Sequence, residues 1–210
     1  CVSLHWTVLT GEARRALEAH ARVARTEGFH LAGGTALALQ LGHRRSVDFD
    51  WFRTEVFSDP LELARKLAAQ GVPWVTRQSE RGTLHGSVGG VRVSFLEFRY
   101  PLLEPPVACS LGFDLASLRD IGAMKLAALA QRGAKKDFFD LIALGKAGLA
   151  LDELLECYRT RFAIQDIGHV LAALTYFADA DRDPEPVLDA RESWEDIKAE
   201  VRRRLRDFAG

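Results

Sequence analysis

The feature that most constrains the fold of this chain is a change of hydrophobic periodicity at the proline-rich segment 101–106. Before this segment, short runs of alternating or β-branched residues are separated by glycine pairs and other turn residues, a pattern typical of short strands. After it, from about residue 113, apolar residues recur at helical spacing. The sequence therefore predicts an α+β protein, in which residues 1–108 form a mixed β-sheet with flanking helices and residues 109–210 form a helical half.

The predicted elements follow from capping and breaking residues as well as from periodicity. In the first half we expect helices over 10–27, 35–41 and 60–70, and strands over 29–32, 47–52, 74–78, 83–88 and 91–98. In the second half we expect helices over 115–131, 135–146, 151–162, 164–179 and 193–208. Thr10 is the expected N-cap of the first helix, and Pro60 is a first-turn residue of the third.

The composition narrows the class of protein. Lys and Arg number 28 against 29 Asp and Glu, so the formal net charge is −1 and no overall field draws the chain to nucleic acid or to a membrane. No apolar run is long enough to cross a membrane, and the N-terminal segment lacks a signal-peptide pattern. Cys1, Cys109 and Cys157 are too few and too widely spaced for a disulfide framework, which favours a reducing, cytoplasmic location. We assign Cys1 no role.

A pair of carboxylates is the first candidate for chemistry. Strict alternation over 47–52 places Asp48 and Asp50 on one strand face, and Val47, Phe49 and Trp51 on the other. Carboxylates at i and i+2 on a strand lie about 7 Å apart at their Cα atoms and can converge on one Mg²⁺, which binds through one or two carboxylates plus substrate phosphates. The alternative is an acidic pair on a solvated face.

A glycine turn precedes this pair. Gly33, Gly34 and Thr35 lie between a predicted strand and a predicted helix. There, backbone N–H groups at the positive end of a helix can bind an anion with no side chain in the way, and Thr35 adds a hydroxyl. The alternative is that the glycines only permit a tight turn. The glycine turn and the carboxylate pair together make one catalytic centre more plausible than either does alone.

Four ordered blocks resemble a known family. They are LAGGTALA (31–38), LGHRRSVDFD (41–50), LRDIGAMKL (118–126) and RGAKKDFFDL (132–141). These blocks resemble the AbiEii/AbiGii-type nucleotidyltransferases of the DNA polymerase β-like superfamily, and they cover about residues 29 to 145. The resemblance implies a nucleotidyltransferase-like sheet domain and a helical domain that contributes to the active site.

The resemblance also implies roles for single residues. Asp48 and Asp50 are expected to hold the metal, and Lys125 and Asp137 to complete the catalytic set. The expected nucleotide-binding residues are Gly33, Gly34, Thr35, Arg44 and Ser46.

Lys125 and Asp137 can also be interpreted without the resemblance. Lys125 interrupts the apolar stripe of a predicted helix, where an unpaired ammonium is costly. It should therefore reach water along its stem or contact an anion, either a nucleotide phosphate, which the resemblance favours, or a carboxylate. Asp137 could instead be an acid that stabilises a helix N-terminus. Lys136 and Asp140 are spaced to form an i, i+4 ion pair.

Other features leave questions open. His43, Arg44 and Arg45 form a cationic loop that could meet a triphosphate. A third carboxylate is common on a later strand of such enzymes, but over 91–97 none shares the expected face, unless a bulge re-aims Glu97. The last predicted helix carries a basic stripe that could contact RNA or remain solvated: Lys198, Arg202, Arg203, Arg204 and Arg206.

These observations predict a Mg²⁺-dependent nucleotidyltransferase that moves a nucleoside monophosphate from a nucleoside triphosphate to an acceptor hydroxyl. The resemblance further implies a toxin of a toxin–antitoxin or phage-defence pair, with a separately encoded antitoxin and, for some relatives, tRNA or another RNA as acceptor. Two alternatives stay open. One is a catalytically silent nucleotide-binding module, suggested by the missing strand carboxylate, and the other is a transferase that modifies a small molecule.

Overall fold

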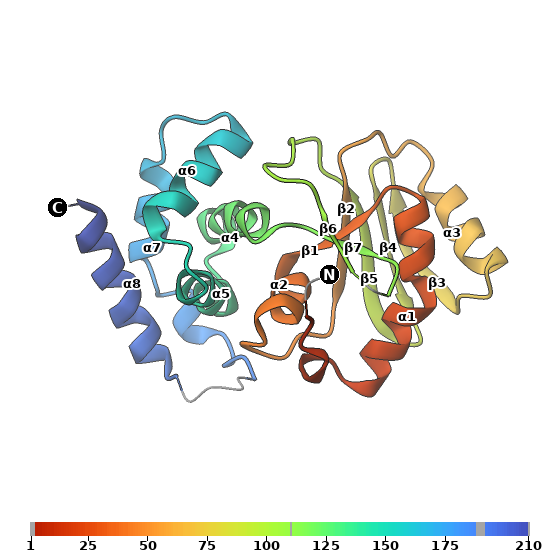
Figure 1. Cartoon of the computed structure of the whole chain (residues 1–210), viewed down its shortest axis with the longest axis horizontal. Helices are drawn as coiled ribbons and strands as arrows, with labels where there is room; N and C mark the ends of the chain where they lie inside the picture. Colours follow the sequence, from red (N-terminus) through yellow and green to blue (C-terminus); the bar gives the residue numbers. More distant parts are fainter. Residues whose placement is uncertain (1–2, 110, 188–191, 210) are drawn as a thin grey trace.

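A seven-stranded mixed sheet forms the centre of the first half of the molecule (Figure 1). The computed structural model describes residues 3–109, 111–187 and 192–209, so Cys1 lies outside the described residues. The strands are β1 (His30–Ala32), β2 (Phe49–Arg53), β3 (Trp74–Glu80), β4 (Thr83–Val88), β5 (Val91–Glu97), β6 (Val107–Ala108) and β7 (Asp114–Leu115). Their order is β3-β4-β5-β2-β1-β7-β6, which confirms the predicted α+β class.

The register of the sheet places β2 at its centre. β2 pairs in antiparallel fashion with β1 and in parallel fashion with β5, so that Asp50 lies opposite Ala32 on one side and Ser94 on the other. β3, β4 and β5 form the two predicted antiparallel hairpins. The sequence did not predict β6 and β7. Because β7 lies beyond residue 108 and pairs with β1, the sheet extends past the expected boundary, and the division into two domains stays a prediction.

The helices of the first half lie close to their predicted positions. They are α1 (Gly11–Thr26), α2 (Gly33–Leu41) and α3 (Pro60–Ala69), preceded by a 3-10 turn, η1 (Trp6–Val8). Thr10 Oγ1 accepts the N–H of Ala13 at 3.1 Å, as expected of an N-cap, and Asp59 caps α3. α1 and α3 cover one face of the sheet, and α2 lies on the side that faces the helical half (Figure 1).

The second half is helical from residue 118 onward. Its elements are α4 (Leu118–Arg132), α5 (Lys135–Lys146), α6 (Leu151–Phe162), α7 (Gly168–Thr175), η2 (Ala180–Arg182) and α8 (Trp194–Ala209). α7 is shorter than the predicted helix over 164–179. It begins late because the carboxylate of Asp166 accepts the N–H of Gly168, a local alternative to the helical hydrogen bond. None of the described helices has the length and apolar character needed to cross a membrane.

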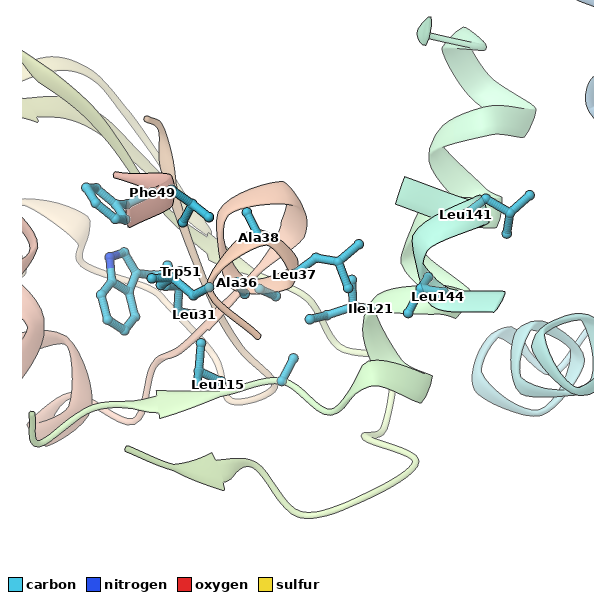
Figure 2. Close-up of a cluster of buried hydrophobic side chains, with 14 of the residues drawn as sticks. Leu31, Ala36, Leu37, Ala38, Phe49, Trp51, Leu115, Ile121, Leu141 and Leu144 are labelled. Atoms are coloured by element: carbon cyan, nitrogen blue, oxygen red, sulfur yellow. The ribbon is translucent and has the colours of Figure 1, made fainter. Parts of the chain in front are cut away.

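One continuous core joins the two halves. Figure 2 shows the side chains of α2, among them Leu37, between those of β1 and β2 on one side and those of α4 and α5 on the other. Leu37, Trp51 and Ile121 are fully buried, which contributes about 1.5–3 kcal/mol each. Packing on both sides therefore fixes α2, whose first turn lies at the candidate site.

Two buried histidines sit within this core region. Trp51 Nε1–H donates to His20 Nε2 at 2.8 Å, so His20 Nδ1–H donates to the carbonyl of Ala16 at 2.6 Å. The neutral ring is thus fully satisfied, and burial lowers the pKa of His20 from 6.5 to about 4. Burial, with the positive charge of Arg161, also lowers the pKa of His30 to about 4.

Candidate active site

The two candidate metal-binding carboxylates lie at the start of β2. Phe49 and Trp51 are buried on the face covered by α1, and Asp50 lies on the opposite face. β2 begins at Phe49, so Asp48 directly precedes the strand, and Val47 is 46% exposed rather than packed beside Phe49 as predicted. The predicted alternation therefore holds from Phe49 onward.

The two carboxylates differ in their partners. Arg92 donates to both oxygens of Asp48, from Nε at 3.2 Å and from Nη2 at 2.8 Å. The carboxylate of Asp50 accepts no hydrogen bond from, and forms no ion pair with, any residue that the structure describes. One carboxylate of the pair is thus held by an exposed arginine, and the other is free of protein partners.

The glycine turn forms the first turn of α2 and lies against Asp50. Gly33 has φ +69°, in the left-handed region, and a Cβ added to it would lie 3.4 Å from Asp50 Oδ2. A Cβ on Gly34 would lie 2.3 Å from Arg44 Nη2. Only glycine fits at the second position without displacing Arg44. The first turn of a helix leaves backbone N–H groups without intrahelical partners, so this turn can bind an anion.

Thr35 connects α2 to the segment before β2. Its hydroxyl donates to the main-chain oxygen of Asp48 and lies 2.7 Å from Ser46 Oγ. Because the single hydroxyl proton of Thr35 goes to Asp48, the proton of the second contact comes from Ser46. Thr35 thereby fixes the position of the carboxylate pair relative to the glycine turn.

Lys125 and Asp140 are at the centre of a buried ion-pair network. Lys125 Nζ lies 2.8 Å from Asp137 Oδ1 and 2.5 Å from Asp140 Oδ2. Arg44 donates to both oxygens of Asp140, at 2.6 and 2.9 Å, and Arg132 donates to Asp137 at 3.0 Å. Of the two outcomes expected for Lys125, the described structure therefore shows contact with a carboxylate, and contact with a phosphate stays a prediction.

The ionisation of Asp140 is set by this network. Its side chain is completely buried, and burial alone would raise its pKa. Lys125 and Arg44 outweigh that effect and hold the pKa of Asp140 well below its usual value of 3.8. Asp140 is thus a fixed negative charge that positions two cations.

Two predictions about this region are wrong. Asp140 does not pair with Lys136, because Arg44 and Lys125 already occupy its oxygens and the exposed Lys136 lies elsewhere on the pocket wall. His43 does not face the pocket, because its Nε2 contacts Asp140 at 2.7 Å. Arg44 could not be identified as the partner from local spacing, because it lies 96 positions from Asp140 along the chain.

These groups meet around one pocket of about 410 Å³. It is lined by Gly33, Gly34, Thr35, Arg44, Ser46, Asp48, Asp50, Phe52, Leu96, Met124, Lys125, Ala128, Gln131, Arg132 and Lys136. The pocket brings together every predicted site residue except Asp137, which is fully buried behind Lys125 and Arg132. A larger cavity of about 590 Å³ lies between α6 and α8. Its two carboxylates come from different helices, Asp152 from α6 and Asp207 from α8, and Asp207 is paired with Arg203, so the smaller pocket is the better candidate site.

Sequence reasoning missed part of the pocket wall. Arg132 lies two turns of α4 beyond Lys125, and Gln131 lies two turns beyond Met124, so helical spacing from Lys125 could have identified Arg132. Arg92 was missed because its contact with Asp48 depends on the pairing of β2 with β5.

The position expected for a third carboxylate holds a serine. Ser94 is the residue of β5 that lies opposite Asp50. Glu97 is directed elsewhere, because its carboxylate accepts the N–H of Phe57 at 2.6 Å and pairs with Arg99. Within the described ranges there is no group of three or more His, Cys, Asp or Glu side chains arranged to hold a metal ion.

Comparison with known proteins identifies the class. A family model described as nucleotidyl transferase AbiEii toxin, type IV TA system, matches residues 15–209. The chain is 36% identical over 204 residues to the uncharacterized protein aq_aa25 of Aquifex aeolicus (strain VF5), covering 95% of this chain and 97% of that protein. The fold matches the crystal structure of JHP933 from Helicobacter pylori with a TM-score of 0.61 at 18% identity, over 94% of this chain and 92% of that one.

The family match over residues 15–209 defines the class of protein as a nucleotidyltransferase. Within that class, the chain belongs to the AbiEii nucleotidyl transferase toxin family of type IV toxin–antitoxin systems.

Proposed function

We propose that this protein is a Mg²⁺-dependent nucleotidyltransferase toxin that moves a nucleoside monophosphate from a nucleoside triphosphate to a hydroxyl of tRNA or another RNA. The observation that carries the proposal is the single pocket that joins the glycine turn, the carboxylate pair and the cations of α4. Nucleotidyl transfer needs these three elements: a phosphate-binding turn, a metal-binding pair and positive charge near the leaving group.

The carboxylate pair fits a metal that arrives with the substrate. Mg²⁺ is commonly bound by one or two protein carboxylates together with substrate phosphates and water. Asp48 and Asp50 supply two carboxylates on one side of the pocket, and Asp50 has no competing partner in the described structure. When bound, the metal would supply charge neutralisation at the reacting phosphate.

The protein residues would then position the nucleotide. The N–H groups of the first turn of α2 bind the phosphates, and Ser46 lies beside them on the pocket wall. Lys125, Arg132 and Lys136 neutralise the charge that develops on the leaving pyrophosphate. Asp137 acts from behind the wall by fixing Lys125 and Arg132.

In this reaction an acceptor oxygen attacks the α-phosphorus and pyrophosphate leaves. The basic stripe on α8 is a poor candidate for binding the acceptor, since ion pairs within the protein occupy Lys198, Arg203 and Arg204. We therefore expect RNA to bind nearer the pocket. A cognate antitoxin protein and a cytoplasmic location are further parts of this proposal.

A transfer assay with the isosteric variant Asp50→Asn tests the proposal. Protein is incubated with each labelled triphosphate, Mg²⁺ and total RNA, and label in RNA is measured with and without a chelator. We expect transfer by the wild type, loss of at least about 100-fold in Asp50→Asn, and no loss in Asp152→Asn, an exposed acid on α6. Asp50 accepts no hydrogen bond in the described structure, so its amide analogue should fold normally.

The outcomes separate the alternatives. Nucleotide binding without transfer to RNA or any small molecule favours the silent binding module. Label in a small molecule but not in RNA favours a transferase that modifies a small molecule. Full activity of Asp50→Asn, or activity that survives removal of divalent cations, contradicts the proposed metal site.

A further inference from the structure

The two sides of β2 are not equivalent for the transfer reaction. In nucleotidyl transfer the attacking and leaving oxygens lie roughly in line on opposite sides of the phosphorus. The glycine turn that would hold the leaving phosphates follows β1, on one side of β2. If the proposed function is correct, the acceptor must approach from the other side, where β5 and β4 lie.

Ser94 is the first polar group on that other side. It lies opposite Asp50 in the β2–β5 register, so the two side chains share one sheet face on strands about 4.8 Å apart. Leu96, two residues further along the same face of β5, lines the pocket. Ser94 does not line the pocket itself, but it lies next to two residues that do, Asp50 and Leu96, on the side of β2 away from the glycine turn.

A histidine lies within hydrogen-bond distance of this serine. His85 of β4 lies opposite Ser94 in the β4–β5 register, and its Nδ1 is 3.0 Å from Ser94 Oγ. Both side chains are half-buried. Phe95, which follows Ser94 on β5, contacts His20 of α1, so Ser94 and its cross-strand partner His85 lie on the face of the sheet opposite α1. Asp50, Ser94 and His85 thus form one row across three adjacent strands.

We propose that Ser94 and His85 receive the proton of the acceptor hydroxyl, in place of a third carboxylate. The acceptor O–H donates its proton to Ser94 Oγ while Ser94 donates its own proton to His85 Nδ1. The acceptor oxygen forms a bond to the α-phosphorus, the bond from the α-phosphorus to the bridging oxygen breaks, and pyrophosphate leaves with that electron pair. The imidazolium then releases one proton to water.

The other groups near this row do not replace the pair. Asp48 and Asp50 face the metal in the proposed function, and Arg92 is bound to Asp48. On β3, Gln78 lies opposite His85 and donates to Glu80 at 2.8 Å, so Glu80 is engaged within its own strand.

The test compares four variants in the RNA transfer assay. We expect Ser94→Ala and His85→Ala to lower kcat by roughly 100-fold or more, the usual contribution of general base catalysis, with KM for the triphosphate changed less than about threefold. Gln78→Ala, one strand further along the same row, is the matched control and should keep wild-type kcat. In the double variant Ser94→Asp/His85→Ala, the new carboxylate can take the proton directly, so we expect at least about tenfold recovery over His85→Ala.

A pH profile separates proton transfer from a purely structural role. Wild-type kcat should fall on the acidic side as His85 becomes protonated, and this fall should be absent in Ser94→Asp/His85→Ala. The inference is overturned if His85→Ala keeps kcat within threefold of the wild type, or if its acidic limb is unchanged. A wild-type protein that binds triphosphate but transfers nothing contradicts the proposed function, and this inference with it.

Discussion

Replacing Lys125 by methionine should expose the electrostatic cost of the buried network. The Lys125 side chain is 6% exposed, and both of its carboxylate partners, Asp137 and Asp140, are completely buried. Lys125→Met keeps most of the aliphatic stem and removes the charge. Asp137 is then left with Arg132 alone, and Asp140 with Arg44 and His43.

The expected magnitude follows from the burial of these charges. Removing one member of a buried ion pair typically costs about 3–5 kcal/mol of unfolding free energy, because the partner remains buried and uncompensated. For a chain of this size each kcal/mol lowers Tm by roughly 2–4 °C, so we expect a fall of roughly 6–20 °C. The second variant, Lys125→Met/Asp137→Asn, removes one charge of each sign and should be more stable than Lys125→Met alone.

Urea unfolding at pH 7, followed by circular dichroism, measures both effects as a double-mutant cycle. We expect a coupling free energy between Lys125 and Asp137 on the order of 1–3 kcal/mol. The reasoning is refuted if Lys125→Met costs less than about 1 kcal/mol, or if the double variant shows the simple sum of the two single changes.

Three further predictions address the glycine turn, the core and the metal pair. Gly34→Ala should lower triphosphate affinity at least about tenfold in calorimetry, because its Cβ would lie 2.3 Å from Arg44 Nη2 and displace that guanidinium; unchanged affinity would show that the close approach is irrelevant to binding. The pKa of His20 falls from 6.5 to about 4 on folding, so the unfolded state binds more protons between these values. The free energy of unfolding should therefore decrease as pH falls through this window, by about 1.4 kcal/mol per pH unit at most and about 3 kcal/mol in total. Urea titrations at several pH values measure this decrease, and the part that comes from His20 should be absent in His20→Gln. Arg92→Ala frees Asp48 from its arginine partner, so the Mg²⁺ concentration for half-maximal transfer should fall several-fold; a rise would mean that Arg92 assists the metal rather than competing with it.

The sequence predicted those parts of the fold that local patterns control. The helices over 135–146 and 151–162 begin and end where their periodicity and breaking residues place them. The order of β1, the glycine turn and β2 also follows from local alternation and from the position of two glycines. In each case the hydrophobic period and the terminating residues indicate the same element, so a short window of sequence is sufficient to predict its type and its ends.

The other parts of the fold and of the site depend on contacts between residues that are far apart in the sequence. β6 and β7 have two residues each, too few to show a period, and they exist because β7 pairs with β1. The i, i+4 spacing favoured a pair between Lys136 and Asp140, yet Arg44 pairs with Asp140 across 96 positions of sequence. A buried carboxylate prefers two donors from a guanidinium to a solvated ammonium, but only the folded chain determines which guanidinium is near.

The ion-pair network also explains how the pocket keeps two carboxylates available next to several cations. Without competing partners, Lys125 and Arg44 could pair with Asp48 and Asp50 and close the site to a metal. Asp137 and Asp140 prevent this, because they hold those two cations from behind the pocket wall at 2.5–2.9 Å.

Asp137 and Asp140 carry two negative charges, whereas the cations that they bind, Lys125, Arg44 and Arg132, carry three positive charges. The excess positive charge of this network and the exposed Lys136 remain at the pocket wall to meet the charge of a metal-bound triphosphate. The buried pairs thus keep positive charge apart from the metal-binding carboxylates before substrate binds, which is the condition that preorganised electrostatic catalysis requires.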